Sequence, residues 1–403
     1  MKNNYLDNPG ALKIDLMLQG IRIEDPVLKA WACGADGMDI LLPMGTLVNV
    51  PCSDYVASTS PYVIKKSGDG HAITFDGAGE VPVRFLPKPE FYYRKTSTGV
   101  PFSRIASVHG SYTVITPSPR CEFFNRKVEC KYCAGNFDVI GADETVFSVD
   151  EVLETVAAVL KEKVSEIIYL SVGFSEGDDG GVEFLRPYVR AIKKHFNVLV
   201  AVEALPPKDN RWIDRTYAMG ADSVLYNLEI YDRELFGLIC PGRAELIGWE
   251  RYAEALGYAA GVFPNGTVAS HLIVGLEPPG STVQGIDFLV SMGVVPILPV
   301  IRPTRDRSYH IHPLTADVII PVYRHLYKAL KGSAVNFRWV RDISMVTTPV
   351  EGRLLVDEGG QGDKATLMES FYGTRLGLKA AWGLSTIRRK LRVKEVKDPS
   401  ENS

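Results

Sequence analysis

Three cysteines lie close together in the sequence and could bind a metal. Cys121, Cys130 and Cys133 fall within thirteen residues, and they are half of the six cysteines in the chain. Thiolates are the usual protein ligands of iron–sulfur clusters. Three of them can hold three irons of a four-iron cluster and leave the fourth iron open to a further ligand. The number and spacing of these cysteines therefore favour an open-site 4Fe–4S cluster.

Other uses of three cysteines are possible. A disulfide is disfavoured because the N-terminus has no apolar segment of the kind found in export signals. A structural zinc site takes four Cys or His ligands, so the fourth would come from a distant residue such as His109 or His271. A catalytic thiol would need a nearby base and would leave two cysteines unexplained. Zinc binding in a non-enzymatic protein therefore stays open as an alternative.

Composition limits the classes of protein to consider. The chain has 403 residues, of which 46% are hydrophobic, enough to bury a core in more than one domain or in one domain with additions. Its net charge of −3 gives no indication of a nucleic-acid or anionic-membrane partner. No apolar run approaches the roughly twenty residues that span a bilayer. The other cysteines, Cys33, Cys52 and Cys240, are scattered singly, so we expect a cytoplasmic protein with mostly reduced thiols.

A regular alternation of strands and helices is predicted between residues 111 and 303. Apolar, β-branched runs alternate there with amphipathic stretches of ten to twenty residues. The predicted strands are Tyr112–Thr116, Glu166–Val172, Val198–Ala204, Ser223–Ile230, Val268–Leu276 and Val294–Ile301. The predicted helices are Val149–Lys163, Gly181–Phe196, Arg211–Met219, Ala244–Ala260 and Thr282–Met292. Ser148 and Glu151 have the spacing of a capping box, which predicts where the first helix begins.

This alternation predicts a parallel sheet covered by helices. Six such units suit an open doubly wound sheet or a barrel, complete or partial. Ligands of both architectures bind at the C-terminal ends of the strands, and the cysteine loop follows the first strand. The first hundred residues read as short strands and turns. After the alternation we expect a helix over Thr315–Lys331, a strand over Asn336–Asp342, a helix over Met368–Lys390 and a charged, disordered tail.

These features together resemble a known family. Radical S-adenosylmethionine (SAM) enzymes carry three clustered cysteines after the first strand of a six-unit partial barrel, separated by three and then two residues, with an aromatic before the last. Cys130-Lys-Tyr-Cys133 matches the second half of that motif, whereas the first gap has eight residues. The longer gap is similar to that of radical SAM proteins encoded beside a nitrilase in a bacterial gene cluster. That likeness includes Gly99–Gly110, Leu228–Asp232, Pro241–Arg243, Leu272–Glu277 and Pro299–Pro303.

The resemblance implies an α/β fold, a partial (β/α)6 barrel with a β-rich N-terminal extension and a C-terminal extension of helix and strand. We expect the extension over residues 1–105, the barrel over 106–310, the C-terminal extension over 311–390 and the tail over 391–403. The implied cofactors are an oxygen-sensitive 4Fe–4S cluster and SAM. The implied chemistry is reductive cleavage of SAM and hydrogen abstraction from a small molecule, with a ferredoxin- or flavodoxin-like electron donor. Neither a second cysteine-bound cluster nor a cobalamin domain is indicated. The altered spacing leaves aminocarboxypropyl transfer open as an alternative.

The resemblance also implies contacts to SAM near the first two strands. Tyr132 could pack against the cofactor, although it could equally anchor the loop. Ser171, Gly173 and Ser175 follow the second strand, where the family has a short segment that touches the methionyl amine. The acidic residues after Ser175 read equally well as a surface turn.

Further candidates lie on the third and fourth strands. Glu203 is a carboxylate within an apolar run, where a charge is costly unless it is paired or bound. Asn227 and Glu229 are two residues apart on one strand, so both point to the same face and could contact ribose or substrate. Arg243 could pair with the methionyl carboxylate, because arginine suits bidentate carboxylate recognition.

The last candidates follow the fifth and sixth strands. The resemblance implies that Val274 and Gly275 contact adenine. Arg302, together with the charged residues 305–307 and the segment Tyr309–His312, is the first choice for cofactor or substrate contacts, with a solvated charged loop as an equal alternative. His271 reads as a core or edge histidine rather than a ligand.

Overall fold

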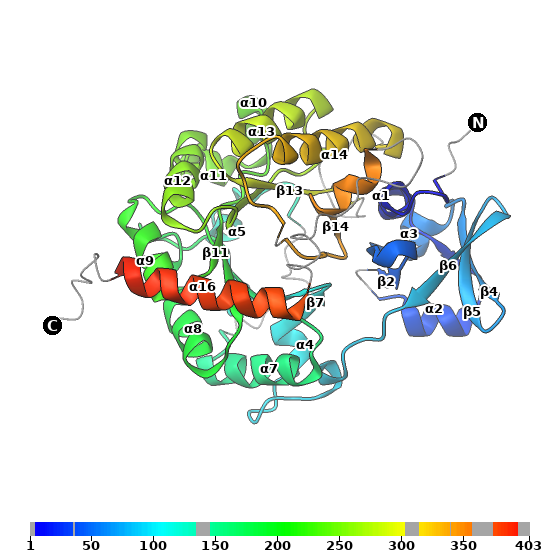
Figure 1. Ribbon diagram of the computed structural model, residues 1–403, viewed down its shortest axis with the longest axis horizontal. Helices are drawn as coiled ribbons and strands as arrows, with labels where there is room; N and C mark the ends of the chain where they lie inside the picture. Colours follow the sequence, from blue (N-terminus) through cyan, green and yellow to red (C-terminus); the bar gives the residue numbers. More distant parts are fainter. Residues whose placement is uncertain are drawn as a thin grey trace.

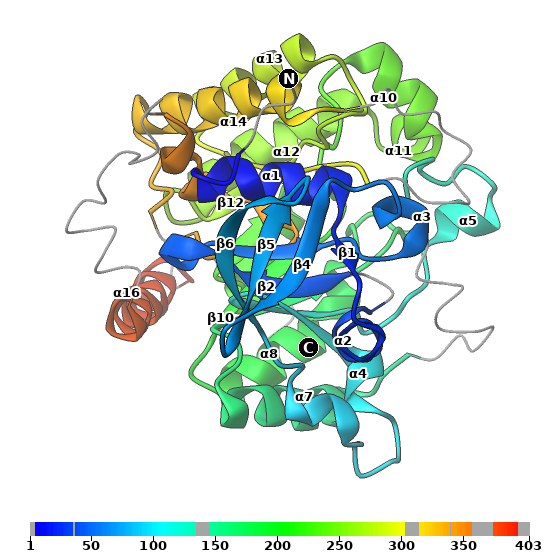
Figure 2. The same cartoon turned by 90° about the vertical axis from the view of Figure 1, so that its right-hand side faces the viewer.

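A computed structural model describes residues 5–34, 37–133, 146–302, 314–338, 340–356 and 374–393. These residues form two sheets, one in the N-terminal part of the chain and one in the remainder (Figure 1). Figure 2 shows the N-terminal sheet face-on, with helix α1 running along one end of it. None of the described helices has both the length and the apolarity needed to cross a membrane.

The N-terminal sheet has the strand order β1-β4-β5-β6-β2-β3. Its strands are β1 (Arg22–Ile23), β2 (Met38–Leu41), β3 (Leu47–Val50), β4 (Tyr62–Ser67), β5 (Gly70–Phe75) and β6 (Ala78–Phe85). The helical segments around it are α1 (Pro9–Gln19), α2 (Pro26–Ala32), η1 (Pro43–Gly45), α3 (Asp54–Ala57) and η2 (Glu90–Tyr93). Helix α1 begins where the Asn8 side chain accepts hydrogen bonds from the backbone N–H groups of Gly10 and Ala11. The short strands and turns predicted for this region are present.

The second sheet is a partial barrel. Its described strands are β7 (Ala106–His109), β8 (Tyr112–Ile115), β9 (Ile167–Ser171), β10 (Leu199–Glu203), β11 (Ser223–Leu225), β12 (Val268–His271), β13 (Val295–Pro299) and β14 (Val346–Thr347). Strands β8 to β13 are parallel and lie side by side in sequence order. In a doubly wound sheet the strand order reverses at one point, so helices cover both faces. Here the strand order does not reverse. Because each crossover is right-handed, all the helices then lie on one face and the sheet curls into part of a barrel. Antiparallel β7 and β14 form the two edges, so the predicted partial barrel is confirmed.

Helices surround this sheet on its outer face (Figure 1). The helical segments of this part of the chain, including those at the ends of the strands, are α4 (Phe102–Ile105), α5 (Glu122–Asn125), α7 (Val149–Glu162), α8 (Val182–His195), α9 (Arg211–Met219), α10 (Arg233–Ile239), α11 (Pro241–Leu246), α12 (Trp249–Val262), α13 (Pro279–Ser291), α14 (Ala316–Lys331), η3 (Glu351–Leu355) and α16 (Arg375–Val393). The capping box predicted for α7 is present, because the Ser148 side chain accepts a hydrogen bond from Glu151 N–H and the Glu151 carboxylate accepts one from Ser148 N–H.

Alternate residues of the barrel strands face the interior. Those that line the interior space or pack at its floor are Tyr112, Val114, Ile167, Tyr169, Leu199, Ala201, Glu203, Ser223, Leu225, Ala269, His271, Val295, Ile297 and Pro299. The intervening residues, such as Ile168, Val200 and Val224, are fully buried in the layer between sheet and helices. The near-continuous hydrophobicity that predicted a parallel sheet thus reflects burial on both faces.

Three predicted elements differ from the structure. The helix predicted over Ala244–Ala260 is two helices, α11 and α12, because Gly248 adopts φ +87° between them. The strand predicted over Asn336–Asp342 is wrong: its described residues form a loop in which Phe337 and Val340 are buried. Because single apolar side chains of this loop are buried, its sequence shows the same alternation of apolar and polar residues as a strand. Helix α16 extends through residue 393, and most of the predicted tail lies outside the described residues.

The C-terminal helix α16 packs at the N-terminal ends of the barrel strands and runs across the view in Figure 1. Its Ser385 hydroxyl donates a hydrogen bond to Asp222, at 2.6 Å, and its Arg389 guanidinium lies 2.7 Å from the same carboxylate. Lys193, from α8, lies 2.8 Å from the other oxygen of Asp222. A buried carboxylate between two cations therefore joins α16 to the base of the barrel.

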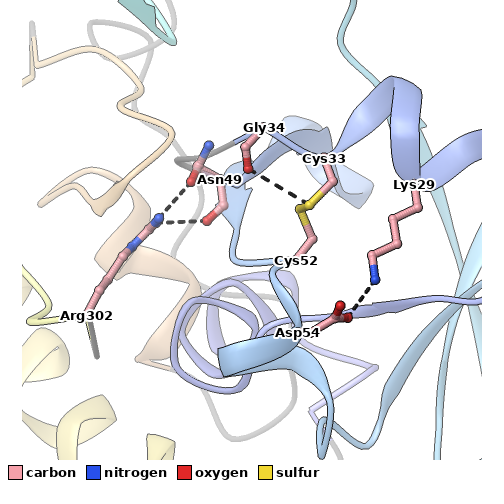
Figure 3. The surroundings of a disulfide bond; sticks show 7 residues. All are labelled: Lys29, Cys33, Gly34, Asn49, Cys52, Asp54 and Arg302. Atoms are coloured by element: carbon pink, nitrogen blue, oxygen red, sulfur yellow. Dashed lines mark hydrogen bonds and ion pairs between the residues drawn. A yellow bond between two sulfur atoms is a disulfide. The ribbon is translucent and has the colours of Figure 1, made fainter. Parts of the chain in front are cut away.

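The N-terminal sheet is attached at the β13–β14 side of the barrel. Arg302, just after β13, donates hydrogen bonds to the side chain and backbone oxygens of Asn49 at 2.7 and 2.9 Å (Figure 3). Nearby, Cys33 and Cys52 form a disulfide between the end of α2 and the segment after β3 (Figure 3). The expectation that these two cysteines stand alone is wrong, because the fold brings together residues 19 positions apart.

Candidate active site

The cysteine loop follows β8, at the C-terminal end of the barrel strands, as predicted. The eight-residue gap between Cys121 and Cys130 contains the single turn of α5 and a left-handed residue, Lys127, with φ +58°. Cys121 precedes that turn and is half-buried, Cys130 is buried, and Cys133 is exposed. The helical turn therefore accommodates the additional residues without moving the loop from the strand ends.

The loop after β9 packs directly on Cys121. The backbone N–H of Glu122 donates a hydrogen bond to the carbonyl of Phe174 at 2.8 Å, and the rings of Phe123 and Phe174 stack with centroids 4.2 Å apart. A Cβ atom on Gly173 would lie 2.8 Å from the Cβ of Cys121, which is closer than packing permits. Glycine at 173 is therefore required by the approach of the two loops.

Backbone amides surround the sulfur of Cys121. Burial raises the pKa of this thiol, and the N–H groups of Phe174 and Phe123 act against that effect by hydrogen bonding to the sulfur. Hydrogen bonds of this kind to cysteine sulfur are one of the means by which proteins set the potentials of iron–sulfur clusters. The two N–H groups are thus placed to hydrogen bond to a sulfur ligand at 121, while burial has the larger effect and keeps the pKa of the free thiol raised.

Cys130 has a fourth cysteine as its neighbour. The proximity of the Cys240 side chain lowers the pKa of the Cys130 thiol, while burial acts in the opposite direction. Cys240 lies between α10 and α11 and is fully buried. Nothing in the sequence pointed to this proximity, since more than a hundred residues separate the two cysteines. Only the adjoining Pro241–Arg243 segment had been marked by the family resemblance.

An ion pair lies next to Cys130. Arg243 is 3.4 Å from the Glu229 carboxylate, and the exposed fractions of the two side chains are 14% and 6%. Arg243 also donates a hydrogen bond to the backbone oxygen of Asn227 at 2.6 Å. Burial raises the pKa of Glu229, although Arg243 partly offsets the effect. Glu229 itself has φ +70°, a strained conformation for a non-glycine residue and one often found at functional sites.

Three buried polar atoms at this point have no hydrogen-bond partner in the structure. They are the Tyr132 hydroxyl, Glu229 Oε2 and the Arg243 Nε. Buried polar groups are rarely left unsatisfied, so such a concentration of them requires an explanation such as a ligand. All three lie on residues that the sequence had predicted to contact a cofactor.

The barrel interior contains a cavity of about 470 Å³. Its wall is mostly apolar and includes Tyr132, Glu229 and His271. Glu203 projects into it and accepts hydrogen bonds from the Tyr169 hydroxyl at 3.1 Å and the Asn227 amide at 2.5 Å. The predicted pair, Asn227 and Glu229, therefore does lie on the interior side of the barrel, together with Glu203.

A second cavity, of about 390 Å³, lies between the loops after β9 and β10 and helix α11. Ser175 and Phe174 line it, as do Leu246 and Arg251. Ser171 ends β9 and pairs in register with Glu203 of the neighbouring strand. The predicted segment 171–175 thus runs from the barrel rim to this second cavity.

Other predicted contacts lie elsewhere. Val274 is buried, and an added Cβ on Gly275 would meet the side chains of Leu314 and Ile301 at 2.4 and 2.6 Å. Neither residue lines the interior cavity, although their neighbours Ile273 and Val300 do. Arg302 reaches the cavity wall but is engaged by Asn49. Residues 305–307 and 309–312 lie outside the described residues.

The chain was compared with known proteins. No protein-family profile matches it. A curated relative, bacteriochlorophyllide c C-7(1)-hydroxylase of Chlorobaculum limnaeum, is 27% identical over 123 residues, which are 30% of this chain and 31% of that protein. The match thus spans less than a third of the hydroxylase.

Solved structures resemble the chain at low sequence identity. The FeFe-hydrogenase maturase HydG has a TM-score of 0.46 and 14% identity, and the match covers 55% of this chain and 50% of HydG. Methylornithine synthase PylB has a TM-score of 0.45 and 16% identity, over 59% of this chain and 72% of that one. A radical SAM methyltransferase from Sphaerobacter thermophilus has a TM-score of 0.40 and 13% identity, and the match covers 68% of this chain and 77% of the methyltransferase. With likenesses this distant, the functional assignment depends on the residues of the site.

The donor set fits an iron–sulfur cluster. Three cysteines share one loop at the strand ends, hydrogen-bond donors point at the Cys121 sulfur, and unsatisfied polar atoms lie beside Cys130. Among the residues that the structure describes, no group of three or more His, Cys, Asp or Glu side chains is gathered so that it could hold a metal ion, and this includes the three cysteines of the loop.

Proposed function

We propose that the protein is a radical SAM enzyme acting on a small molecule. The observation that supports this most strongly is the set of unsatisfied atoms of Tyr132, Glu229 and Arg243 beside a buried cysteine at the strand ends. When bound by Cys121, Cys130 and Cys133, a 4Fe–4S cluster would supply the electron that cleaves SAM and starts hydrogen abstraction.

The charged residues next to Cys130 are suited to the amino-acid part of SAM. Arg243 offers a guanidinium edge to a carboxylate, and Glu229 offers an oxygen to an ammonium group. Both groups are largely withdrawn from water, so each pairing would be stronger than at a surface. Engagement of both would also satisfy the two atoms that are otherwise without partners.

The interior cavity is the proposed substrate site. Its apolar wall excludes water, and the Glu203 carboxylate is held in place by Tyr169 and Asn227. A small molecule bound there would lie next to Tyr132 and Glu229, on the same side of the strands as the cysteine loop. The proposal includes a ferredoxin- or flavodoxin-like electron donor, for which the exposed Cys133 end of the loop is the nearest surface.

The test is anaerobic purification with iron and sulfide analysis and electron paramagnetic resonance of the reduced protein. We expect about four irons and four sulfides per chain and a reduced-cluster signal that changes when SAM is added. Cys121→Ala should remove both. Zinc without sulfide, or a cluster signal indifferent to SAM, would overturn the proposal and favour a closed metal site.

Product analysis tests which bond of SAM breaks. Reduced enzyme incubated with SAM should release 5′-deoxyadenosine. Methylthioadenosine in its place would contradict hydrogen abstraction and would support aminocarboxypropyl transfer, the alternative suggested by the longer gap between Cys121 and Cys130.

A cytoplasmic location and sensitivity to oxygen belong to the same proposal. A reducing compartment protects such a cluster but disfavours disulfides, so the Cys33–Cys52 pair provides a check. Thiol labelling in intact cells should find these two cysteines reduced. Complete protection of both from labelling in growing cells would contradict the cytoplasmic location.

A further inference from the structure

The outer face of helix α16 carries a row of exposed aliphatic side chains, which we call the aliphatic stripe. They are Leu376, Leu384, Ile387 and Leu391, with exposed fractions of 68%, 63%, 59% and 67%. At 3.6 residues per turn these positions fall within about 80° of the helix circumference, and the exposed Ala380 lies among them. Scattered apolar residues are normal on a protein surface, whereas a contiguous apolar patch indicates a surface that binds something.

Basic side chains flank the aliphatic stripe on both sides. Lys379 and Lys390 lie along one edge of it and Arg388 along the other, and all three residues are exposed. Within Arg375–Val393 the chain has six lysines or arginines and no aspartate or glutamate. The net charge of the whole chain, −3, does not reveal this, because the cations are concentrated on one helix. The outer face of α16 is therefore both apolar and positively charged.

The opposite face of α16 is fixed to the barrel. The buried Ser385 and the Arg389 guanidinium contact the Asp222 carboxylate at 2.6 and 2.7 Å. Arg388 also donates a hydrogen bond to the carbonyl of Phe263 at 3.3 Å. Figure 1 shows α16 in front of the barrel, and Figure 2 shows it at the left-hand edge of the molecule. The helix is therefore held with its aliphatic stripe directed away from the protein.

The charge and shape of this face indicate what covers it. A second copy of α16 would bring two positively charged helices together, which their like charges oppose. An anionic membrane surface complements the face instead. Apolar side chains can enter the boundary between headgroups and acyl chains, while the flanking lysines and arginines reach the phosphates. Because the cations lie on both sides of the stripe, they suit an extended anionic surface better than a single acidic patch on another protein.

We infer that α16 binds the surface of an anionic membrane, with its aliphatic stripe inserted among the lipids and its exposed cations beside their headgroups. This inference does not depend on the proposed function. The helix packs at the N-terminal ends of the barrel strands, whereas the cysteine loop follows the C-terminal end of β8. A membrane bound by α16 would therefore leave the cysteine loop uncovered.

The test is flotation of the full chain, purified anaerobically, with lipid vesicles. Vesicles of phosphatidylcholine are compared with vesicles of phosphatidylcholine and phosphatidylglycerol in equal parts. We expect binding to the second kind only, and weaker binding as the salt concentration rises. Ile387→Asn should weaken binding about tenfold, because one apolar side chain of the stripe is lost. The double variant Lys379→Gln/Lys390→Gln should weaken it roughly twentyfold, because each cation near an anionic surface contributes about fivefold.

The matched control is Val318→Asn. Val318 is an exposed aliphatic residue, at 46%, on a different helix, α14, so this variant should bind vesicles as the wild type does. Ile387 is exposed, so Ile387→Asn is expected to fold, which circular dichroism checks. If it does not fold, the lysine double variant tests the inference by itself, since both lysines are exposed. Metal content should be unchanged in the α16 variants, which lie at the opposite end of the strands from the cysteine loop.

Several results would overturn the inference. Absence of binding to phosphatidylglycerol vesicles, or equal binding to vesicles of phosphatidylcholine alone, would contradict recognition of an anionic membrane. A wild-type dimer, measured by light scattering, that dissociates in Ile387→Asn would assign the aliphatic stripe to a second copy of the chain. An acidic protein that co-purifies with the wild type but not with Ile387→Asn, in the absence of vesicle binding, would assign the stripe to a protein partner.

Discussion

Arg243 and Glu229 form a largely buried ion pair at the mouth of the barrel, with 3.4 Å between Nη2 and Oε1. Their neighbour is a cysteine thiol, and one further atom on each side chain has no partner. The pair is thus incompletely satisfied within the protein. This is the pattern expected where a zwitterionic ligand completes the hydrogen bonding.

Removing either member of the pair should destabilise the protein. Arg243→Gln or Glu229→Gln leaves an uncompensated buried charge, a loss of about 3–5 kcal/mol. The double variant should lose less than the sum of the two, because neither charge is then left alone. Anaerobic thermal unfolding measures these effects. Arg233→Gln, whose pair with Glu250 is exposed, is the control and should cost about 1 kcal/mol or less. Strict additivity of the buried variants would show that the two charges do not interact.

Gly173 is predicted to be essential for cluster assembly. In Gly173→Ala the new Cβ would meet the carbonyl of Arg120 at 2.4 Å and the Cβ of Cys121 at 2.8 Å, so the cysteine loop must move. We expect the variant to fold, by circular dichroism, but to retain much less iron and sulfide per chain. Gly237→Ala is the matched control, because nothing lies within 4 Å of the added atom. Full iron content in Gly173→Ala would refute the close approach.

The fold could be predicted from sequence because its signals are local. Each barrel strand is a short β-branched run, and each helix has a repeating apolar face, so six strands were located within a few residues. Predicted strand ends were less accurate. The fourth was expected to reach Ile230, but β11 ends at Leu225, and beyond it only an isolated bridge joins Glu229, with φ +70°, to Leu272.

The site could be predicted only in part, because its contacts join distant segments. The cysteine loop could be recognised from the spacing of its cysteines, and Asn227 and Glu229 from their alternation in one apolar run. Cys240 could not be recognised, because a single cysteine after a helix has no distinguishing neighbour in the sequence. Arg302 was selected for its position after the sixth strand, but its partner Asn49 belongs to the N-terminal sheet and could not be foreseen.

Arg302 is expected to hold the N-terminal sheet against the barrel. Arg302→Ala removes two hydrogen bonds from a charged donor to Asn49, each worth about 1.5–3 kcal/mol. Asn49→Ala removes only one of these two, the one to Oδ1, and also the hydrogen bond that the Asn49 amide donates to Asp39 within the N-terminal sheet. Limited proteolysis should therefore release the N-terminal sheet fastest in Arg302→Ala and at an intermediate rate in Asn49→Ala. The change of the cluster signal with SAM should persist in both. Loss of that change with unaltered proteolysis would make Arg302 a cofactor contact instead.

The Cys33–Cys52 disulfide should stabilise the N-terminal sheet when it is formed. It closes a loop with a sequence separation of 19, for which chain entropy predicts about 3 kcal/mol. Cys33→Ser is therefore expected to unfold at a lower temperature than the oxidised wild type and at the same temperature as the reduced one. Equal unfolding temperatures for oxidised and reduced wild type would show that the disulfide does not stabilise the protein.

Asp222 should make the attachment of α16 depend on pH. Burial acts to raise the pKa of this carboxyl, but Lys193 and Arg389 outweigh it and hold the pKa below its ordinary value. A depressed folded pKa means that the ionised group stabilises the folded state above the unfolded pKa, near 3.9, and that this contribution is lost as the pH falls towards the folded pKa. Asp222→Asn leaves two partly buried cations unpaired and should cost about 3–5 kcal/mol at pH 7. The difference in the free energy of unfolding between Asp222→Asn and wild type should become smaller below about pH 4. Thermal unfolding at pH 7, 5, 4 and 3 measures it, with Asp209→Asn, an exposed pair with Arg211, as the control. A difference that is constant across this range would show that ionisation of Asp222 does not hold α16 in place.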